Sequence, residues 1–474
     1  MNRRIRIIFS SVLILAGLVI LGWWLSANPT RDFTASIPGA DNRVSSGGSA
    51  AESVRIGEFF EQYESEVPDL NETWPRFRGE DFDNISKSPV KLIDKFGPSG
   101  PKILWSVELG EGHASPAIYK GLVYLLDYNE QMRSDMLHCY SLTSGKELWR
   151  RWYHVSVKRN HGMSRTVPAV TEDYVLTIGP RGHVMCVNRK NRDFLWGLDI
   201  EKQYESEIPL WYTGQCPLID NNKAIIATGG KALMIAVDCS SGKILWETPN
   251  EQGWKMSHSS IMPFTFGGRK MFVYSAVGGV CGIAADGKDE GKILWSTNAW
   301  QHPVVAPAPV CMPDGRIFIT AGYGAGSMNL KLSGNGDNFK IEVIREYTPK
   351  EGLSCEVQTP IFYKGYLFGV LTKDAATLRN QLVCSDPEDT RKFVWTSGQE
   401  NRFGMGPYII ADNKLYLLND DGTLTIIRPD VTRYIQLDQA RVFEGQDAWG
   451  PFAIADGFLL MRDSKRMFCL DMRI

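Results

Sequence analysis

The sequence predicts an all-β fold: an eight-bladed β-propeller of four-stranded blades, preceded by one N-terminal transmembrane helix. Three observations carry this prediction. A Trp-ended phrase and a proline both recur at a period of about 44–52 residues, which is the size of one propeller blade. The segments between them show short alternating strands and Gly turns rather than helical spacing. One uncharged run near the N-terminus is long enough to cross a bilayer.

The composition is that of a globular protein and excludes two classes. Hydrophobic residues make up 43% and charged residues 22% of the chain, which excludes a mostly disordered protein. The 52 basic and 54 acidic residues nearly balance, so nucleic acid is not expected as a partner. The 45 Gly and 14 Trp favour many turns and short strands over long helices.

Residues 1–27 predict a membrane anchor. Three arginines within the first six residues precede an uncharged run over 7–25, and a helix of that length spans a hydrocarbon core of about 30 Å. The arginines would stay cytoplasmic, so we expect a single-pass protein whose C-terminal domain lies on the periplasmic, extracytoplasmic side. The alternative is a cleaved signal peptide, for which Leu25-Ser26-Ala27 is a weak cleavage site.

Residues 28–73 are predicted to form a flexible linker between the anchor and the propeller. The chain is rich in small polar residues as far as about Ser53, including the run SSGGS at 45–49. Within this range, the apolar positions of residues 54–66 partly fit helical spacing and predict a short amphipathic helix. The propeller domain is then expected over 74–474.

Each repeat has one order of elements. A proline opens a short apolar strand, a Gly-containing turn leads to a second strand, and a third strand and a Gly-Lys turn lead to a fourth that ends in Trp. Eight prolines mark the repeats and predict eight blades: Pro116, Pro168, Pro217, Pro263, Pro309, Pro360, Pro407 and Pro451. The phrase at Lys102–Leu109 (KILWSVEL) reads as a fourth strand but precedes the first proline. We therefore expect it to complete the last blade, whose third strand lies at 467–471, and to close one monomeric ring.

The repeat ending resembles a known family. The phrases GKELW at 145–149 and GKILW at 242–246 and 291–295 resemble the repeat of the pyrroloquinoline-quinone-like (BamB-like) β-propellers. The phrase WPRFRG at 74–79 resembles the WPxFRG opening of a bacterial branch common in planctomycetes. The resemblance implies that the repeated Trp packs between neighbouring blades, here Trp105, Trp149, Trp196, Trp246, Trp295 and Trp395. The fifth and seventh repeats lack it, so those blades are expected to be irregular.

The same resemblance implies an alternative function, a PQQ-dependent (quinoprotein) dehydrogenase. That branch holds its quinone with a disulfide between adjacent cysteines and with Ca²⁺ bound by Glu, Asn and Asp. The nine Cys here include no adjacent pair, and five lie in third strands of different blades, where Cys behaves as a small apolar residue. No haem-attachment motif, nucleophile elbow or metal-ligand spacing of the seven His is present. No cofactor and no catalysis are therefore expected, with PQQ and Ca²⁺ as the alternative.

The loops that lead into the first strands predict a binding site. First strands line the central channel of a propeller, so these loops ring one mouth of it. They hold polar and aromatic side chains that a small ligand or peptide segment could use, and the alternative is a mouth that is polar because water fills it. The candidate channel-mouth ligand site is His113, Arg165, Trp211, Gln215, His258, Trp300, His302, Gln358 and Trp449.

Together these features predict a membrane-tethered, exported propeller that acts as a protein- or ligand-binding scaffold. The resemblance implies envelope or outer-membrane protein assembly as the nearest task. The expected partners are the membrane, through residues 7–25, and either envelope proteins or a small ligand, bound at the mouth or at a strand edge. A carbohydrate-binding module is a further alternative, because exposed Trp and Tyr rings can stack on sugars.

Overall fold

The computed structural model describes residues 3–26, 54–445 and 447–474. The chain divides into two units, Met1–Ser53 and Val54–Ile474. In the first unit the described residues form one helix, α1 (Arg3–Ser26). The predicted linker as far as Ser53, and Ala27 of the candidate cleavage site, lie outside the described residues.

The predicted transmembrane helix at residues 7–25 is not supported. The run does form a helix, since it lies within α1. However, in the part of the chain that the structure describes, no helix was found to be both long and apolar enough for a membrane span.

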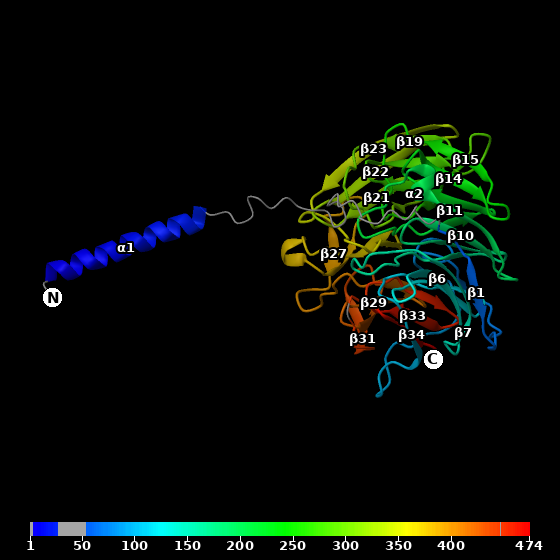
Figure 1. Cartoon of the computed structure of the whole chain (residues 1–474), viewed down its shortest axis with the longest axis horizontal. Helices are drawn as coiled ribbons and strands as arrows, with labels where there is room; N and C mark the ends of the chain where they lie inside the picture. Colours follow the sequence, from blue (N-terminus) through cyan, green and yellow to red (C-terminus); the bar gives the residue numbers. More distant parts are fainter. Residues whose placement is uncertain (1–2, 27–53, 446) are drawn as a thin grey trace. The chain divides into compact units, whose positions relative to one another are not determined.

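The second unit is an eight-bladed propeller, as predicted. Its described residues form eight antiparallel sheets that follow one another around a ring in chain order (Figure 1). Blade 1 contains β4 (Ala117–Tyr119), β5 (Leu122–Asn129), β6 (Ser134–Ser141) and β7 (Glu147–His154). Blade 2 contains β8 (Ala169–Val170), β9 (Tyr174–Ile178), β10 (His183–Asn188) and β11 (Phe194–Asp199), followed by α2 (Ile200–Tyr204). Blade 3 contains β12 (Leu218–Asp220), β13 (Lys223–Ala227), β14 (Ala232–Asp238) and β15 (Ile244–Pro249).

The next blades repeat this order. Blade 4 contains β16 (Met262–Phe266), β17 (Arg269–Ala276), β18 (Gly279–Ala284) and β19 (Ile293–Thr297). Blade 5 contains β20 (Val310–Cys311), β21 (Arg316–Ala321), β22 (Gly326–Asn335) and β23 (Asn338–Tyr347). Blade 6 contains β24 (Ile361–Tyr363), β25 (Tyr366–Val370), the short helix η1 (Ala376–Leu378), β26 (Leu382–Ser385) and β27 (Phe393–Thr396). Blade 7 contains β28 (Tyr408–Ala411), β29 (Lys414–Leu418), β30 (Thr423–Arg428) and β31 (Ile435–Arg441).

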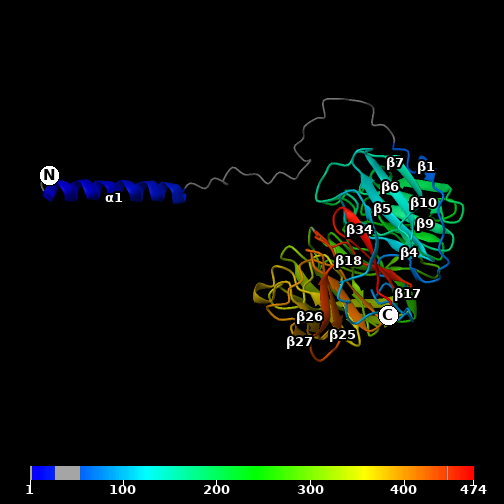
Figure 2. The same ribbon diagram turned by 90° about the horizontal axis from the view of Figure 1, so that it is seen from below.

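Blade 8 confirms the predicted ring closure. It joins β32 (Ala453–Ala455), β33 (Phe458–Arg462) and β34 (Arg466–Asp471) from the C-terminus to β3 (Ile103–Glu108) from the N-terminal part. β3 pairs antiparallel with β34, with Trp105 opposite Cys469. Figure 2 shows β34, in red, lying beside the strands of blade 1. Because the outer strand of blade 8 comes from the other end of the ring, the first and last repeats are held together by backbone hydrogen bonds.

A β-bulge explains the repeated Leu-Trp phrase. In every blade the register between the third and fourth strands shifts by one residue. In blade 2, Trp196 lies opposite Cys186 and Phe194 opposite Val187, so Leu195 is the extra residue. A bulge bends and twists the outer strand. In the fifth and seventh blades the same bulge occurs, but the residue after it is Arg345 or Asp438 in place of Trp.

Several of the repeated Trp side chains contact the following blade. The indole Nε1 of Trp196 in blade 2 donates to the carbonyl oxygen of Cys239 in blade 3 at 2.9 Å. Trp105 donates in the same way to Leu142 of blade 1 at 2.8 Å. These bonds satisfy the polar atom of a ring that otherwise supplies apolar contact between blades.

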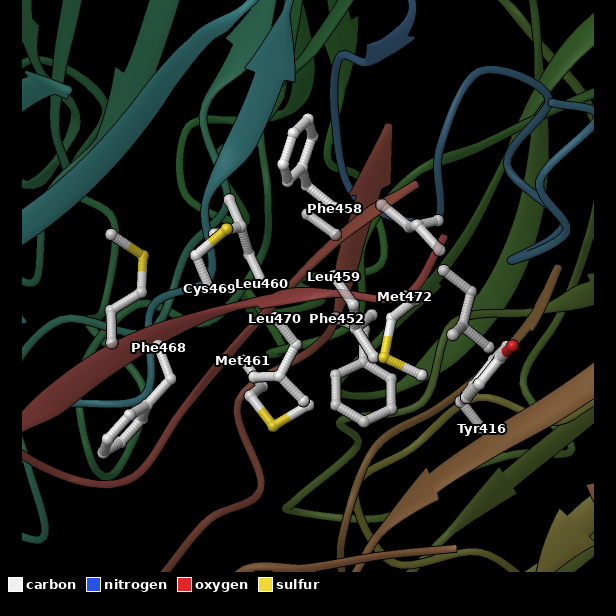
Figure 3. Close-up of a cluster of buried hydrophobic side chains, with 14 of the residues drawn as sticks. Tyr416, Phe452, Phe458, Leu459, Leu460, Met461, Phe468, Cys469, Leu470 and Met472 are labelled. Atoms are coloured by element: carbon white, nitrogen blue, oxygen red, sulfur yellow. The ribbon is translucent and has the colours of Figure 1, made fainter. Parts of the chain in front are cut away.

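The hydrophobic core lies between and within the sheets. The largest cluster combines blade 8 with parts of blades 1 and 7. Figure 3 shows Leu459, Leu460 and Leu470 of blade 8 in this cluster with Tyr416 of blade 7. The five third-strand cysteines are free and buried among such side chains, as predicted: Cys139, Cys186, Cys281, Cys384 and Cys469.

The helix predicted within residues 54–66 is wrong, because this segment adds a strand to blade 1. β1 (Phe59–Gln62) pairs antiparallel with the outer strand β7. The Phe59 ring stacks on Trp152 at 5.5 Å, and Arg150 Nε donates to the Glu61 carboxylate at 3.0 Å. The open edge of β7 supplies backbone partners that a short helix would not have. The compact unit therefore starts at Val54, earlier than the predicted boundary at residue 74.

Residues 75–85, which follow β2 (Thr73–Trp74) and which we call the plug segment, close one end of the central channel. The Pro75 carbonyl accepts a hydrogen bond from Val170 of blade 2, and Arg78 donates to Thr359 and Pro360 at the start of blade 6. Blades 2 and 6 are four places apart in a ring of eight, so they lie on opposite sides of the channel. A segment that bonds to both within four residues must cross the channel axis.

Candidate functional site

A cavity of about 330 Å³ occupies the other end of the channel. Phe77 of the plug segment contributes to its wall, and the remaining lining residues come from all eight blades. Most belong to the loops that lead into the first strands, where the sequence predicted a mouth. The lining residues are Phe77, His113, His161, Arg165, Trp211, Gly214, Cys216, His258, Ser260, Val304, Ala306, Tyr323, Glu356, Val357, Gln358, Lys373, Met405, Asp447, Trp449 and Pro451.

Six of the nine residues proposed from the sequence line this cavity: His113, Arg165, Trp211, His258, Gln358 and Trp449. The other three do not. Trp300 is 0% exposed and packs in the core, with its ring edge-to-face with His302 at 4.3 Å. Gln215 is buried too, and its side chain bonds to the backbone of Ala227 on β13. The assignments of Trp300, His302 and Gln215 to the mouth are therefore corrected.

One side of the mouth is built around Trp449. The His113 imidazole stacks on the Trp449 indole with ring centroids 3.4 Å apart and planes 15° from parallel. The Arg165 guanidinium lies over the same indole, 5.5 Å from its centroid. Gln358 Nε2 donates to the Trp449 carbonyl oxygen at 2.8 Å. Residues from three other blades thus fix the position of Trp449, although it lies in a loop.

A second group of side chains at the mouth is built around Trp211. Its indole stacks on the Tyr323 ring at 5.5 Å and lies near the His258 ring at 6.4 Å. The Lys373 ammonium lies 5.4 Å from the Tyr323 centroid and forms an ion pair of 3.2 Å with Glu356. Arg165 joins the two groups, because its Nε donates to the Trp211 carbonyl oxygen at 2.6 Å.

The backbone around the mouth is strained. Trp211 and Tyr212 have φ values of +65° and +74°, and Tyr323 has φ of +55°. Side chains of this size rarely adopt the left-handed region, which costs about 1–3 kcal/mol for each residue. Two more lining residues, His161 and Asp447, also have positive φ. Strain of this kind clusters at functional sites, where packing holds it in place.

Burial sets the ionisation of the two histidines and of Arg165 at the mouth. Burial, and then the charges of Arg165 and Arg462, lower the pKa of His113 to about 2. Burial, followed by the Arg165 charge, lowers the pKa of His258 to about 4. Both imidazoles are therefore neutral at pH 7, whereas Arg165 stays charged even though burial lowers its pKa to about 10.

The depressed pKa of His258 makes a prediction about acid stability. At pH values between about 6.5 and 4 the unfolded chain protonates this histidine and the folded chain does not, so folding stability falls as the pH drops through this window. We expect His258→Gln to remove this contribution. The melting temperature of the variant should therefore fall less between pH 7 and pH 4 than that of the wild type. An equal loss in both proteins, measured by thermal denaturation, would contradict a buried neutral His258.

Several lining residues were not selected from the sequence. His161, Glu356 and Asp447 lie in the first-strand loops but were not singled out there. Tyr323 and Lys373 lie in the β21–β22 and β25–β26 connections, which lead into third strands. The signal that could have found them is weak, because only the Gly-Tyr-Gly sequence at 322–324 marks one of these turns as unusual.

Comparison with known proteins agrees with this architecture. Residues 95–253 match the family model described as outer membrane protein assembly factor BamB. The structure of BamB from Moraxella catarrhalis is 10% identical, with a TM-score of 0.50 over 78% of this chain and 99% of that chain. The chain has a BamB-like propeller fold. The computationally designed Ika8 protein is 12% identical, with a TM-score of 0.51 over 78% of this chain and 99% of that one.

A third similar structure is an enzyme. Quinohemoprotein alcohol dehydrogenase from Comamonas testosteroni is 13% identical, with a TM-score of 0.43 over 84% of this chain and 80% of that chain. No curated protein sequence matches this chain. At these identities the similarity to solved structures concerns the fold alone.

The donor groups at the mouth do not fit a quinone held with Ca²⁺. Ca²⁺ takes six to eight oxygen ligands, several of them carboxylates. Of the two acidic residues that line the cavity, Glu356 is paired with Lys373. Within 3–26, 54–445 and 447–474, no three His, Cys, Asp or Glu side chains gather closely enough to hold a metal ion. We therefore derive no step through such a group.

Proposed function

We propose that this protein is a binding propeller whose channel mouth takes a small ligand. The observation that carries the proposal is the 330 Å³ cavity, closed at its far end by the plug segment and lined by every blade. Its size falls at the lower end of the range for small-molecule sites, about 300–1,000 Å³. Fixed indoles at Trp211 and Trp449 and the charge of Arg165 supply the few oriented groups that such a site needs.

A ligand screen on the purified full-length chain tests this proposal. We expect compounds that raise the melting temperature of the wild type to lose that effect in Trp449→Ala, because the indole forms one wall of the cavity. Trp152→Ala is the matched control, since Trp152 lies on the outer strand β7 and stacks on Phe59 of β1. Compounds that still raise the melting temperature of Trp449→Ala but no longer raise that of Trp152→Ala would bind away from the channel mouth. That result would refute the proposal.

The match of residues 95–253 to the BamB family favours a second candidate, a scaffold in envelope or outer-membrane protein assembly. In this candidate the partner is a protein. Co-purification of the full chain from membranes would test it: an outer-membrane protein or assembly factor recovered in stoichiometric amount supports the candidate. Recovery of the chain alone under mild extraction opposes it.

Membrane attachment through residues 7–25 and an extracytoplasmic propeller are further parts of the proposal. They are supported by the three N-terminal arginines and by the exposed apolar side chains of α1, such as Leu15 and Val19. Cell fractionation with an N-terminal sequence determination tests them. A mature chain that starts near Asn28 would show cleavage.

A further inference from the structure

We infer that the ligand of the channel mouth is a small organic anion with an apolar body, whose carboxylate group pairs with Arg165. This inference rests on the proposed function, because it names the chemical class of ligand for the same cavity. Three observations lead to it: an uncompensated cation, an apolar wall, and a limited volume.

Arg165 carries the charge at the mouth that we assign to recognition. The exposed Asp447 also lines the cavity, but within the described ranges its carboxylate forms no ion pair with Arg165. Its hydrogen bonds go to backbone carbonyl oxygens, those of Trp211, His161 and Gly162 among them, and within the described ranges no carboxylate forms an ion pair with it. The other cation that lines the cavity, Lys373, is neutralised by Glu356 at 3.2 Å. A largely buried cation without a counter-ion is costly, and a bound anion would supply the missing charge. The carbonyl bonds hold the guanidinium in one orientation before any ligand arrives.

The apolar part of the wall favours an apolar ligand body. It is formed by Phe77, Cys216, Val304, Ala306, Met405 and Pro451, together with the indole rings of Trp211 and Trp449. An aliphatic or aromatic group gains free energy when it leaves water for this surface. Hydroxyl groups of a sugar that faced these apolar side chains would leave water without hydrogen-bond partners, which costs free energy. The wall therefore favours an apolar acid over a carbohydrate, although both can stack on Trp.

The volume restricts the ligand to one small apolar group with its acid. A cavity of 330 Å³ with a closed far end cannot accept a folded domain or a long chain. Two sources present the same chemistry, a free organic acid and the C-terminal residue of a peptide with an apolar side chain. The experiment below separates them.

The test measures binding to the full-length chain by calorimetry with four probes. These are 3-phenylpropionate, its neutral analogue 3-phenylpropionamide, the polar anion glucuronate, and the tripeptide Gly-Gly-Phe with a free C-terminus. We expect 3-phenylpropionate to bind at least about tenfold more tightly than the amide, because a charge-assisted hydrogen bond is roughly twice as strong as a neutral one. We expect glucuronate to bind more weakly than 3-phenylpropionate, because it has no apolar body. Tighter binding of the tripeptide than of the free acid assigns the peptide as the source, and weaker binding assigns the free acid.

Variants locate the charge. We expect Arg165→Gln to weaken the binding of 3-phenylpropionate about tenfold or more and to change the affinity for the amide by no more than about twofold. Arg165→Lys keeps a charge without the planar fork, so it should retain part of the preference for the acid even if Arg165→Gln perturbs the loop. Arg433→Gln, at an exposed arginine between β30 and β31 of blade 7, is the matched control and should change neither affinity.

The outcomes separate this inference from the proposed function. If the amide and the acid bind equally well, or if Arg165→Gln weakens both to the same extent, the anion assignment is wrong and the mouth remains a ligand site. If glucuronate binds best, the apolar wall does not select the ligand and the inference fails as well. If the broad ligand screen finds no compound whose effect depends on Trp449, the proposed function itself fails.

Discussion

Replacement of Arg78 by Met should lower the free energy of unfolding by about 3 kcal/mol or more, because it leaves buried carbonyl groups without hydrogen-bond donors. The Arg78 side chain is 5% exposed and donates to four carbonyl oxygens, two within the plug segment and two at the start of blade 6. Burial lowers the pKa of Arg78 to about 10, so it remains charged at neutral pH. Removing the charge recovers its desolvation cost, but backbone carbonyls cannot be replaced, so the loss exceeds that gain.

Equilibrium denaturation of the full chain measures this loss. Lys87→Met is a matched control from the neighbouring sequence, since Lys87 is exposed and pairs only with Asp81. We expect the control to change the free energy of unfolding by about 0.5 kcal/mol at most. A similar small effect for Arg78→Met would show that the plug segment is not held by this side chain.

The second large effect concerns Gly145, in the Gly-Lys turn of blade 1. Gly145 has φ of +68°, and a Cβ atom there would lie 2.6 Å from Cδ2 of Trp105 in blade 8. The Trp105 ring cannot move away freely, because its Nε1 is bonded to Leu142. We expect Gly145→Ala to lower the free energy of unfolding by about 3 kcal/mol, from backbone strain and from the displaced indole together.

Gly253→Ala separates these two causes. Gly253 has a similar φ of +63°, but nothing lies within 4 Å of its added Cβ atom. It should therefore cost only about 1 kcal/mol, the strain of a left-handed Ala. In a Trp105→Ala background the cost of Gly145→Ala should fall to the same value. Equal costs for both glycines in the wild type would mean that Trp105 does not press on the turn.

The ring could be predicted because its information is local and repeated. Each blade carries its own proline and turns, and most carry a phrase that ends in Trp, so the period alone predicts eight sheets. The misplaced KILWSVEL phrase then predicts how the ring closes, and β3 confirms it. β1 and the plug segment have no counterpart in other repeats. Their positions depend on which strand edge is open and on which blades face each other across the channel. The residues of β1 and of the plug segment carry no sequence signal for either.

The mouth was predicted at the level of loops but only partly at the level of side chains. The proline that follows each first-strand loop locates the loop in the sequence. It does not indicate the direction in which each side chain of the loop points. In the blade 5 loop, Trp300 and His302 pack against each other and Trp300 lies in the core, and Val304 and Ala306 line the cavity in their place. Tyr323 and Lys373 were missed because their connections lead into third strands, and the prediction considered first strands alone.

The origin of β3 also determines when the protein can finish folding. During synthesis Trp105 is made before blade 1, and its partner Cys469 is made only after blades 1 to 7. Until then the outer strand of blade 8 has no sheet to join, and the apolar side chains of blades 1 and 7 that pack against blade 8 stay uncovered. Contacts between such distant parts of a chain form slowly. A chain that stops before β34 can therefore build most of its blades and still lack a closed ring, with apolar faces of blades 1 and 7 free to contact other chains.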